Sequence, residues 1–582
     1  MRSGQSESVL ARLVPRTASL KLFFALAPAV IYLTVIYLLP VLRLLTISVF
    51  DPGFTLEHYQ HLFGVPVYRA VLINTFQISI TVALVCLVLG YPAAYVLVTA
   101  PPWLARILIV FVMLPFLASS LVRNYAWIFL LGSRGVVNAT LMRWGVISNP
   151  LPLIFNRSGV IIGMVNILLP YMILILLSVM RGIKRDLLTA AQSLMASPFT
   201  AFRRVFLPLS LPGIGAGTLI VFVLALAFFI TPAMLGGVHD VMIANIIGSV
   251  TATLNWGFAG ALVTVLLVSS LLIIGLMQRF FGGVGLLAGD KSATLRSVGV
   301  RRGREGKIMR LLDTAINPVW PYFFPVIGAA AFLFLIVPIV IMVPLSFSSA
   351  TYFVFPPPGY SLRWYEKYFT APDWLDSTWH SFEIGALTTL LALSLAIPAS
   401  LAIARWSSRA GAFLYFSLLS PMIMPSIVIA VSVFYVLNQL NLTYTVLGVA
   451  MGHTIVSLPI ALVVLVAALR NFDRNLERAA ISLGSSPFRT TLRITLPLLS
   501  TAVFTAGLFA FLNSFDELLI ALFVSGVNAG TLPKKMWESL QELDPTIAAV
   551  STLLVLFVIA TMGVLALVQW QGRRRNQDSA KA

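Results

Sequence analysis

The sequence is poor in charged residues and has almost no cysteine. Only 10% of its 582 residues are charged, whereas 59% are hydrophobic. A soluble globular chain carries about 25% charged residues, so this composition excludes an ordinary soluble protein, and so apolar a chain is not expected to be disordered. The single cysteine, Cys86, excludes a disulfide framework and a zinc or iron–sulfur site built from cysteines. We therefore expect an integral membrane protein.

The sequence also lacks the signatures of common enzymes. Its five histidines show no metal-ligand spacing, and neither Gly-x-Ser-x-Gly nor His-Glu-x-x-His occurs. The segments 289–291 (GDK) and 306–308 (GKI) both fail the phosphate-binding pattern Gly-x4-Gly-Lys-Ser/Thr. We expect neither an enzyme nor a nucleotide, cofactor or metal site in this chain.

Long apolar stretches dominate what is present. A bilayer core about 30 Å thick needs roughly 20 mostly apolar residues per spanning helix, and the strands of a membrane β-barrel would instead alternate in polarity. Twelve suitable stretches without such alternation lie at about 22–49, 71–98, 107–131, 159–180, 211–235, 258–279, 322–347, 379–404, 411–438, 444–469, 500–526 and 548–570. We predict an all-α integral membrane fold with about twelve transmembrane helices. The first is expected to stay uncleaved, because the apolar run between Lys21 and a cleavage-like Ala25-Leu26-Ala27 is too short for a signal peptide.

Basic residues indicate how the chain is oriented. With both termini inside, the inner segments hold 29 Lys and Arg residues and the outer segments hold nine. Basic residues accumulate on the cytoplasmic side, so we predict cytoplasmic tails at 1–21 and 571–582 and a basic cytoplasmic linker at 280–321. The net charge of +19 is then explained by topology and by contact with anionic lipid, and a nucleic-acid partner is not expected.

The chain contains two copies of one six-helix unit. The segment 190–199 (AAQSLMASPF) matches 479–488 (AAISLGSSPF) at an offset of 289 residues, and earlier residues such as Pro92 and Pro398 pair at an offset of 306. Each copy contains an even number of spans, so both have the same orientation in the membrane. We predict two parallel transmembrane domains, at 22–279 and 322–570.

Each copy contains one long loop on its predicted cytoplasmic side, the first loop (181–208) and the second loop (470–497). Both run about 28 residues, whereas a plain helix–helix connection needs about 2–8. From the residues alone, two interpretations are open. A small Ala-rich helix in each loop docks into a partner's groove, or both are solvated loops retained by gene duplication.

These loops resemble the coupling loop of ABC importer permeases, which has the form Glu-Ala-Ala-x3-Gly-x9-Ile-x-Leu-Pro and docks the ATPase subunit. The second loop matches at Ala479, Ala480, Gly484, Ile494, Leu496 and Pro497, with Arg478 at the Glu position and Glu477 just before it. The first loop matches at Ala190, Ala191, Leu207 and Pro208, with Thr189, Met195 and Val205 at the Glu, Gly and Ile positions. These departures imply that the two loops do not couple identically.

The resemblance implies a set of ATPase-coupling residues in both loops. They are Ala190, Ala191, Leu194, Pro198, Phe199, Pro208, Ala479, Ala480, Leu483, Gly484, Pro487, Phe488 and Pro497.

The two halves resemble the first and second permeases of the spermidine/putrescine importer type, here fused in one chain. The first half carries 231–237 (TPAMLGG) and 255–257 (NWG), and the second carries 513–517 (NSFDE) and 523–526 (FVSG). This resemblance implies a permease of the bacterial cytoplasmic membrane that imports a small polar solute, a cationic polyamine in the first place. Fused permeases of the same broad group import ferric iron or 2-aminoethylphosphonate, so these substrates stay open.

The same resemblance implies partners. An external binding protein would deliver substrate to the outer loops at 51–70, 132–158, 236–257, 348–378 and 527–547. Two copies of a separate cytoplasmic ATPase, which binds the ATP and magnesium, would engage the first and second loops.

Three acidic residues fall inside the predicted spans: Glu383, Asp516 and Glu517. A carboxylate at mid-membrane costs about 2.5–3.5 kcal/mol and normally faces a polar interior. Asn513, Asp516 and Glu517 have i, i+3, i+4 spacing, which places them on one helix face. We predict that this face lines the substrate path and favours a cationic amine; a structural pair or a gate is the alternative. Glu383 lies near the outer end of its predicted helix, so its carboxylate is expected to reach the membrane–water interface.

Other residues and other functions fit less well. Asn124, Tyr125 and Trp127 mark the outer end of the third span, where most aromatic residues are interfacial anchors.

A gradient-driven secondary transporter also has twelve helices in two parallel halves, but the turn at 99–106 (TAPPWLAR) lacks the Gly/Asp/Arg-rich signature of that group. A membrane enzyme lacks any catalytic constellation.

Overall fold

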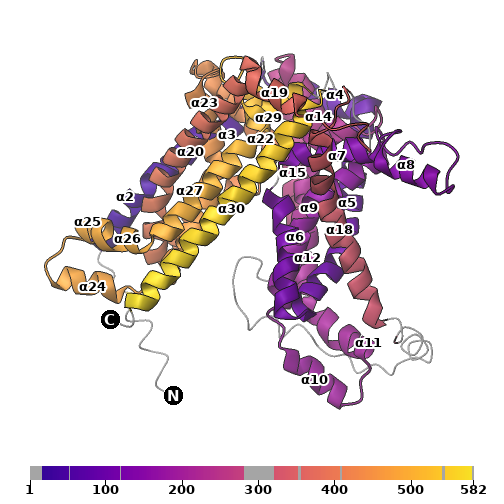
Figure 1. Ribbon diagram of the computed structural model, residues 1–582. Coiled ribbons are helices and arrows are strands. Elements are labelled where there is room, and N and C mark those ends of the chain that lie inside the picture. Colours follow the sequence, from indigo (N-terminus) through magenta and orange to yellow (C-terminus); the bar gives the residue numbers. More distant parts are fainter. Residues whose placement is uncertain are drawn as a thin grey trace. The chain divides into compact units, whose positions relative to one another are not determined.

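The computed structural model describes residues 16–51, 53–117, 119–280, 317, 320–351, 356–406, 409–539 and 544–579. These residues are almost entirely helical, and the described part of the chain contains isolated β-bridges but no strand (Figure 1). The first 15 residues and nearly all of the predicted linker lie outside the described residues.

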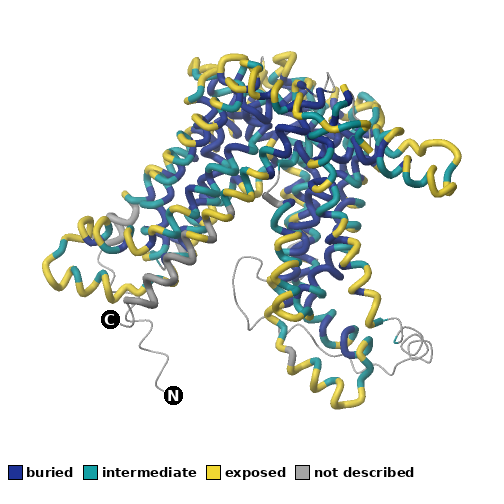
Figure 2. Tube along the Cα trace, in the orientation of Figure 1, coloured by how far each residue is buried: buried dark blue, intermediate teal, exposed yellow. Residues whose placement is uncertain are grey.

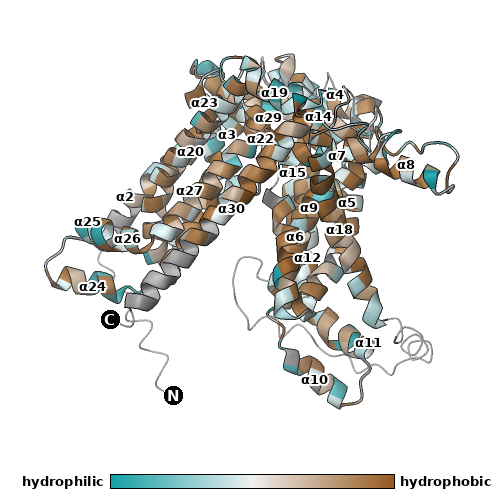
Figure 3. Ribbon diagram, in the orientation of Figure 1, coloured by the Kyte–Doolittle hydropathy of each residue, from teal (hydrophilic) through white to brown (hydrophobic). Residues whose placement is uncertain are grey.

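Eight described helices are long and apolar enough to cross a membrane, and two bent helix pairs raise the number to ten. The two remaining predicted spans correspond to shorter apolar helices, Ser426–Gln439 and the start of the last helix. The long helices are mostly hydrophobic along their length, as expected for segments that cross a membrane (Figure 3). The predicted all-α membrane fold is therefore confirmed.

The helices form two compact units that differ from the two halves of the sequence. Unit 1 comprises Met1–Ile47, Tyr368–Glu542 and Leu556–Ala582, and unit 2 comprises Ser48–Lys367 and Leu543–Val555. The first helix of each sequence repeat therefore packs with the helices of the other repeat. The boundaries predicted at 22–279 and 322–570 describe the repeat in the sequence, not the packing in space.

Unit 1 combines the first span with most of the second repeat. Its elements are α2 (Arg16–Leu33), η1 (Thr34–Leu38), α3 (Leu39–Ile47), α20 (Pro372–Arg405), α21 (Arg409–Leu418), η3 (Ser420–Met422), α22 (Ser426–Gln439), α23 (Val446–Arg470), α24 (Asn475–Ser482), α25 (Pro487–Thr490), η4 (Thr491–Thr495), α26 (Leu496–Leu498), α27 (Ser500–Asp516), α28 (Leu519–Val524) and α29 (Leu532–Glu538). Helix α2 packs on α20, and Tyr32 donates a hydrogen bond to the carbonyl oxygen of Met451 on α23.

Unit 2 combines the rest of the first repeat with the first span of the second. Its elements are α4 (Glu57–Gly64), α5 (Pro66–Thr99), α6 (Pro102–Leu117), α7 (Ser120–Leu131), α8 (Val136–Arg143), α9 (Arg157–Met180), α10 (Arg185–Ser193), α11 (Pro198–Ala201), η2 (Phe202–Phe206), α12 (Leu207–Leu226), α13 (Ile230–Leu235), α14 (Ile243–Ala252), α15 (Trp256–Phe280) and α18 (Trp320–Ser346). Helix α18 packs on α5, α6 and α7. Two further helices, α19 (Arg363–Thr370) and α30 (Thr546–Ser579), have residues in both units.

One helix of each repeat is central. In an apolar 18-residue stretch of α9, and in one of α23, 72% of the residues are buried. In the corresponding stretches of α5 and α20, 33% and 39% are buried (Figure 2). Because α9 and α23 are related by the 289-residue offset, the two repeats use the same helix as their core. The residues on these two helices are therefore the ones most enclosed by protein.

The fifth predicted span of each repeat is interrupted rather than continuous. The span predicted at 211–235 is divided into α12 and α13, and the span at 500–526 into α27 and α28. The side chain of Asn245 donates to the carbonyl oxygen of Phe229 at the first interruption, and Glu517 Oε1 accepts from the backbone N–H of Ile520 at the second. Such side-chain partners stabilise irregular backbone at membrane depth. Hydropathy alone missed both interruptions, because each stretch is apolar enough overall to be interpreted as one continuous span.

Candidate functional site

The first and second loops fold into the same helix–turn–helix at equivalent positions. Each begins with a short helix, α10 or α24, followed by the helices α11 or α25 (Figure 1). At the end of α10, the N–H of Met195 donates to the carbonyl of Gln192, and the N–H of Ala196 donates to that of Ala191. This pair of bonds is a Schellman turn. The turn after α24 repeats it, with Gly484 bonded to Ile481 and Ser485 bonded to Ala480.

The Schellman turn places one residue of each loop in the left-handed region of backbone conformation. That residue is Gly484 in the second loop, with φ +85°, and Met195 in the first, with φ +64°. A Cβ added to Gly484 would meet no atom within 4 Å, so glycine is needed there for its backbone conformation and not for space. This explains the glycine of the Glu-Ala-Ala pattern physically.

A serine–proline pair starts the second helix of each loop. The side chains of Ser197 and Ser486 accept hydrogen bonds from the backbone N–H groups of Thr200 and Arg489. Pro198 and Pro487 follow at the first helical position, where a missing N–H costs nothing. One turn of π-helix, η2 or η4, then precedes Pro208 or Pro497.

The turns expose large apolar side chains. Leu194 and Met195 are 83% and 96% exposed in the first loop, and Leu483 and Phe488 are 88% and 75% exposed in the second. Ala190, Pro198, Ala479, Pro487 and Pro497 are exposed as well, whereas Ala191, Phe199, Pro208 and Ala480 are half-buried. Both turns therefore present a small apolar surface beyond the ends of the long helices, as a docking surface would.

The second loop is fixed to its unit by polar contacts. Glu477 on α24 forms an ion pair with Arg405 at the end of α20, with 2.7 Å between Oε1 and Nη2. The same Glu477 oxygen accepts a hydrogen bond from Thr495 Oγ1 at 2.6 Å, and Arg474 donates to the carbonyl of Ala404. Glu477 thus joins both ends of the second loop to α20.

The first loop is fixed by aromatic rings instead. The Phe202 ring lies 4.6 Å from that of Trp320 and 5.1 Å from that of Phe324, both on α18. Phe199 also contacts Trp320, with ring centroids 4.8 Å apart. Helix α18 belongs to the second sequence repeat, so the exchanged span supports the first loop.

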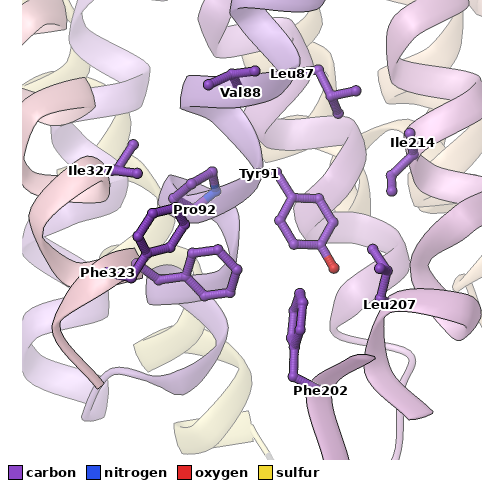
Figure 4. Close-up of a pocket in the computed structure, with 10 residues that line it drawn as sticks. Leu87, Val88, Tyr91, Pro92, Phe202, Leu207, Ile214, Phe323 and Ile327 are labelled. Atoms are coloured by element: carbon purple, nitrogen blue, oxygen red, sulfur yellow. The ribbon is translucent and has the colours of Figure 1, made fainter. Parts of the chain in front are cut away.

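A cavity of about 290 Å³ lies beside this aromatic cluster (Figure 4). Its lining is apolar apart from the Tyr91 hydroxyl, which is hydrogen-bonded to Ser210 Oγ at 2.8 Å. Ten residues line it: Leu87, Val88, Tyr91, Pro92, Phe202, Leu207, Ile214, Phe323, Phe324 and Ile327.

The predicted substrate-path residues lie at the interruption between α27 and α28. Helix α27 ends at Asp516, and Glu517 follows with extended backbone at φ −72° and ψ 114°. Asn513 and Asp516 therefore lie on one helix, with Asn513 Nδ2 donating to Ser457 Oγ at 3.1 Å. The expectation that all three share one helical face is wrong for Glu517, because the chain leaves the helix before it. Its carboxylate instead accepts from Ile520 at the start of α28, at 3.1 Å.

Sequence reasoning missed a buried histidine one helix away. His453 is fully buried on α23, and its Nδ1 lies 2.9 Å from Ser514 Oγ, which donates to Thr388 Oγ1 at 3.2 Å. No motif spacing includes His453; its place in the middle of an apolar span was the available signal. The network joins α20, α23 and α27 directly beside Asn513.

Asn124, Tyr125 and Trp127 are not interfacial anchors. All three are buried on α7, and Asn124 Oδ1 accepts a hydrogen bond from Thr231 on α13 at 3.0 Å. The interfacial assignment was wrong because α7 packs against α9, α13 and α18, and hydropathy does not report these neighbours. Among the described residues, no group of three His, Cys, Asp or Glu side chains could hold a metal ion.

Comparison with known proteins identifies the repeated unit. The family described as binding-protein-dependent transport system inner membrane component matches residues 86–282 and again 396–576, more than half of the chain. Each match contains one of the two loops and the interrupted fifth span of its repeat.

Individual relatives match about two fifths of the chain each. The spermidine/putrescine transport system permease protein PotB of Haemophilus influenzae is 37% identical over 226 residues, which are 39% of this chain and 79% of that protein. PotB of Escherichia coli is 36% identical over 38% of this chain and 81% of its own length. The putrescine transport system permease protein PotI of Escherichia coli is 29% identical over 42% of this chain and 88% of its own length. The chain therefore belongs to the binding-protein-dependent transport system inner membrane components, as a multi-pass ABC importer permease that carries the family domain twice.

Proposed function

We propose that this chain supplies both permease domains of an ATP-driven importer that takes a small amine from an external binding protein. Two copies of a cytoplasmic ATPase engage the first and second loops, and their closure alternates access to the path between the two membrane faces. The paired helix–turn–helix loops, each with an exposed apolar turn, carry this proposal. Both termini are cytoplasmic in it, as the basic residues predict.

A cationic polyamine is the first substrate candidate. It is supported by the relatives PotB and PotI, which are spermidine/putrescine and putrescine transport system permeases. The carboxylates of Asp516 and Glu517 support it as well, since carboxylates favour ammonium groups. The equivalent positions of the first repeat are Ala227 and Phe228, so the acidic pair occurs in one repeat only. Ferric iron and 2-aminoethylphosphonate are the alternative substrates.

Partner contact is tested by site-specific photo-cross-linking. A photoreactive residue at Leu194 or Leu483 is expected to cross-link to an ATP-hydrolysing polypeptide, whereas one at the lipid-facing Leu390 is not. Uptake by the purified chain alone in proteoliposomes, driven by a solute gradient without ATP, would contradict the proposed mechanism.

The acidic pair is tested by charge removal that preserves the fold. Glu517→Gln removes the charge but keeps an oxygen that accepts from Ile520. Asp516→Asn removes the charge of Asp516 and keeps the size of its side chain. Each is expected to reduce putrescine uptake at least tenfold in the assembled transporter. Glu383→Gln, at an exposed carboxylate of α20, serves as the control and is expected to change uptake less than twofold. If all three variants take up putrescine as fast as the parent chain, Asp516 and Glu517 do not line the substrate path.

A further inference from the structure

Three of the buried polar groups on α7 and α9 of unit 2 have no partner among the described residues. They are Asn124 Nδ2, Trp127 Nε1 and Asn166 Oδ1, and none has a hydrogen-bond partner within the described part of the chain. Asn124 and Asn166 are fully buried, and Trp127 is 6% exposed. Two of the three groups are donors and one is an acceptor.

Shared neighbours place these three residues in the same region of unit 2. Asn124 and Trp127 lie one turn apart on α7, and Asn166 lies one turn from Gly163 on α9. A Cβ added to Gly163 would lie 3.2 Å from Asn124 Oδ1, so α7 and α9 are in close contact there. Phe334 on α18 joins the other two groups, because its ring lies 5.1 Å from the Trp127 ring and its carbonyl oxygen accepts from Asn166 Nδ2 at 2.9 Å.

The second polar atom of each of the two asparagine side chains already has a hydrogen-bond partner. Asn124 Oδ1 accepts from Thr231, and Asn166 Nδ2 donates to Phe334, so neither amide can rotate freely to satisfy its remaining group. Thr231 lies on α13, directly after the interruption of the α12–α13 span. The three groups are thus held in place beside the first repeat's broken helix.

The second repeat has apolar side chains at the four equivalent positions. The residues equivalent to Asn124, Trp127, Asn166 and Thr231 are Ala430, Val433, Ile455 and Ile520. A Cβ added to Gly452, the counterpart of Gly163, would contact Ile520 and Val433, so the helices approach each other similarly. The fold therefore does not require polar side chains at these positions, and their presence in the first repeat needs another reason.

We propose that Asn124, Trp127 and Asn166 form a binding site for an oxygen-bearing group of the transported solute. The two donors take a carboxylate, phosphonate or hydroxyl oxygen, and Asn166 Oδ1 takes an N–H or O–H of the same solute. This inference rests on the proposed function, because a solute reaches so buried a site only along a transport path.

The site narrows the substrate class. A fully protonated polyamine only donates hydrogen bonds, so it satisfies Asn166 and leaves Asn124 Nδ2 and Trp127 Nε1 unsatisfied. An amine that also carries an oxygen acceptor satisfies both kinds of group. The site therefore favours an amino acid, amino alcohol or aminophosphonate over a bare diamine. Within the proposed function, it supports the aminophosphonate alternative over the polyamine that the relatives suggest.

Ligand binding to the full-length chain in lipid nanodiscs tests this without ATP or the ATPase. The probes are butane-1,4-diamine and 4-aminobutanoate, which differ in one end group, and 2-aminoethylphosphonate as a second oxygen-bearing amine. Thermal stabilisation over a concentration series is the measurement. We expect at least one oxygen-bearing amine to bind tenfold more tightly than the diamine. A diamine that binds as tightly as both oxygen-bearing amines would overturn the proposal.

Variants locate the binding. Trp127→Phe keeps the ring and removes the N–H, and Asn124→Leu removes the amide; each is expected to weaken binding of the preferred amine at least tenfold. Trp103→Phe, at an exposed tryptophan of α6, is the matched control. If Trp127→Phe and Asn124→Leu bind all probes like the parent chain, the three groups hold only buried water and the site does not exist. Because this readout requires no ATP hydrolysis, its failure is distinguishable from failure of the ATP-driven mechanism.

Discussion

Met195 and Gly484 occupy the same position of the same turn in the two loops, yet only one of them is a glycine. Both adopt positive φ, +64° for Met195 and +85° for Gly484, and both donate their backbone N–H to the carbonyl three residues earlier. A side chain in the left-handed region costs about 1–2 kcal/mol. The first loop therefore holds a strained residue where the second holds a relaxed one.

Substitutions at these two positions are predicted to have opposite effects on the stability of the two turns. Gly484→Ala should destabilise the second loop by about 1 kcal/mol, because the added Cβ meets the left-handed penalty without any new contact. Met195→Gly should relax the turn of the first loop but remove an exposed apolar side chain. Hydrogen exchange of each loop, measured in the purified chain, checks both directions. A second loop whose protection is unchanged by Gly484→Ala would contradict the turn assignment.

Breaking the anchor of the second loop is predicted to uncouple it from α20. Glu477→Ala removes the ion pair with Arg405 and the hydrogen bond from Thr495, at a cost of about 1.5–3 kcal/mol for bonds to a charged group. ATP-dependent uptake by the assembled transporter should fall several-fold. Glu477→Gln retains an acceptor for Thr495 and should have a smaller effect. Equal losses in both variants would indicate that the charge on Glu477 is the only relevant feature.

Truncating the aromatic anchor is predicted to affect the first loop alone. Phe202→Ala removes a buried ring that packs on Trp320 and Phe324, and deletions of this kind cost about 3–5 kcal/mol. The midpoint of thermal unfolding should fall, and hydrogen exchange of the first loop should rise. The counterpart Thr491→Ala in the second loop is the matched control, because no aromatic cluster surrounds it in the described structure. A similar change in both variants would contradict the asymmetric anchoring.

Acid is predicted to weaken the contact between α19 and the start of α30. Burial raises the pKa of Asp544, but the hydrogen bonds from Lys367 and Thr546 outweigh it, so its pKa is lowered from the usual value. A group whose pKa is lower in the folded state stabilises the fold at pH values above its unfolded pKa of about 3.9. That stabilisation is lost as the pH falls through the lower, folded pKa.

The test is thermal unfolding of the parent chain and Asp544→Asn as a function of pH. The variant should be less stable at pH 7, and the difference should shrink toward pH 3 as Asp544 becomes protonated in the parent. Asp376→Asn, at an exposed carboxylate of α20, is the control. A difference that stays constant down to pH 3 would show that the lost stability does not come from the charge on Asp544.

Local patterns were sufficient for much of this protein. Helix positions follow from apolar run length, because a membrane-spanning helix must satisfy its own backbone, and the two loops follow from their repeated sequence. The Ser-Pro caps and the glycine of the turn, found in the structure, are local features too, because each depends only on residues that are close in the sequence. Asp516 and Glu517 could also be identified from the sequence, because a carboxylate inside an apolar stretch is unusual whatever its neighbours in space are.

Tertiary structure alone decided the rest. Hydropathy does not report which helix packs on which, so the exchange of α2 and α18 between the sequence halves was not predicted. It does not report helix interruptions either, because Glu517 and Asn245 stabilise them through contacts outside the regular helix. The burial of Asn124, Trp127 and His453 likewise depends on neighbours that are far away in the chain. The sequence by itself determined which segments enter the membrane and which two loops protrude, whereas the packing between distant helices determined which polar side chains are enclosed.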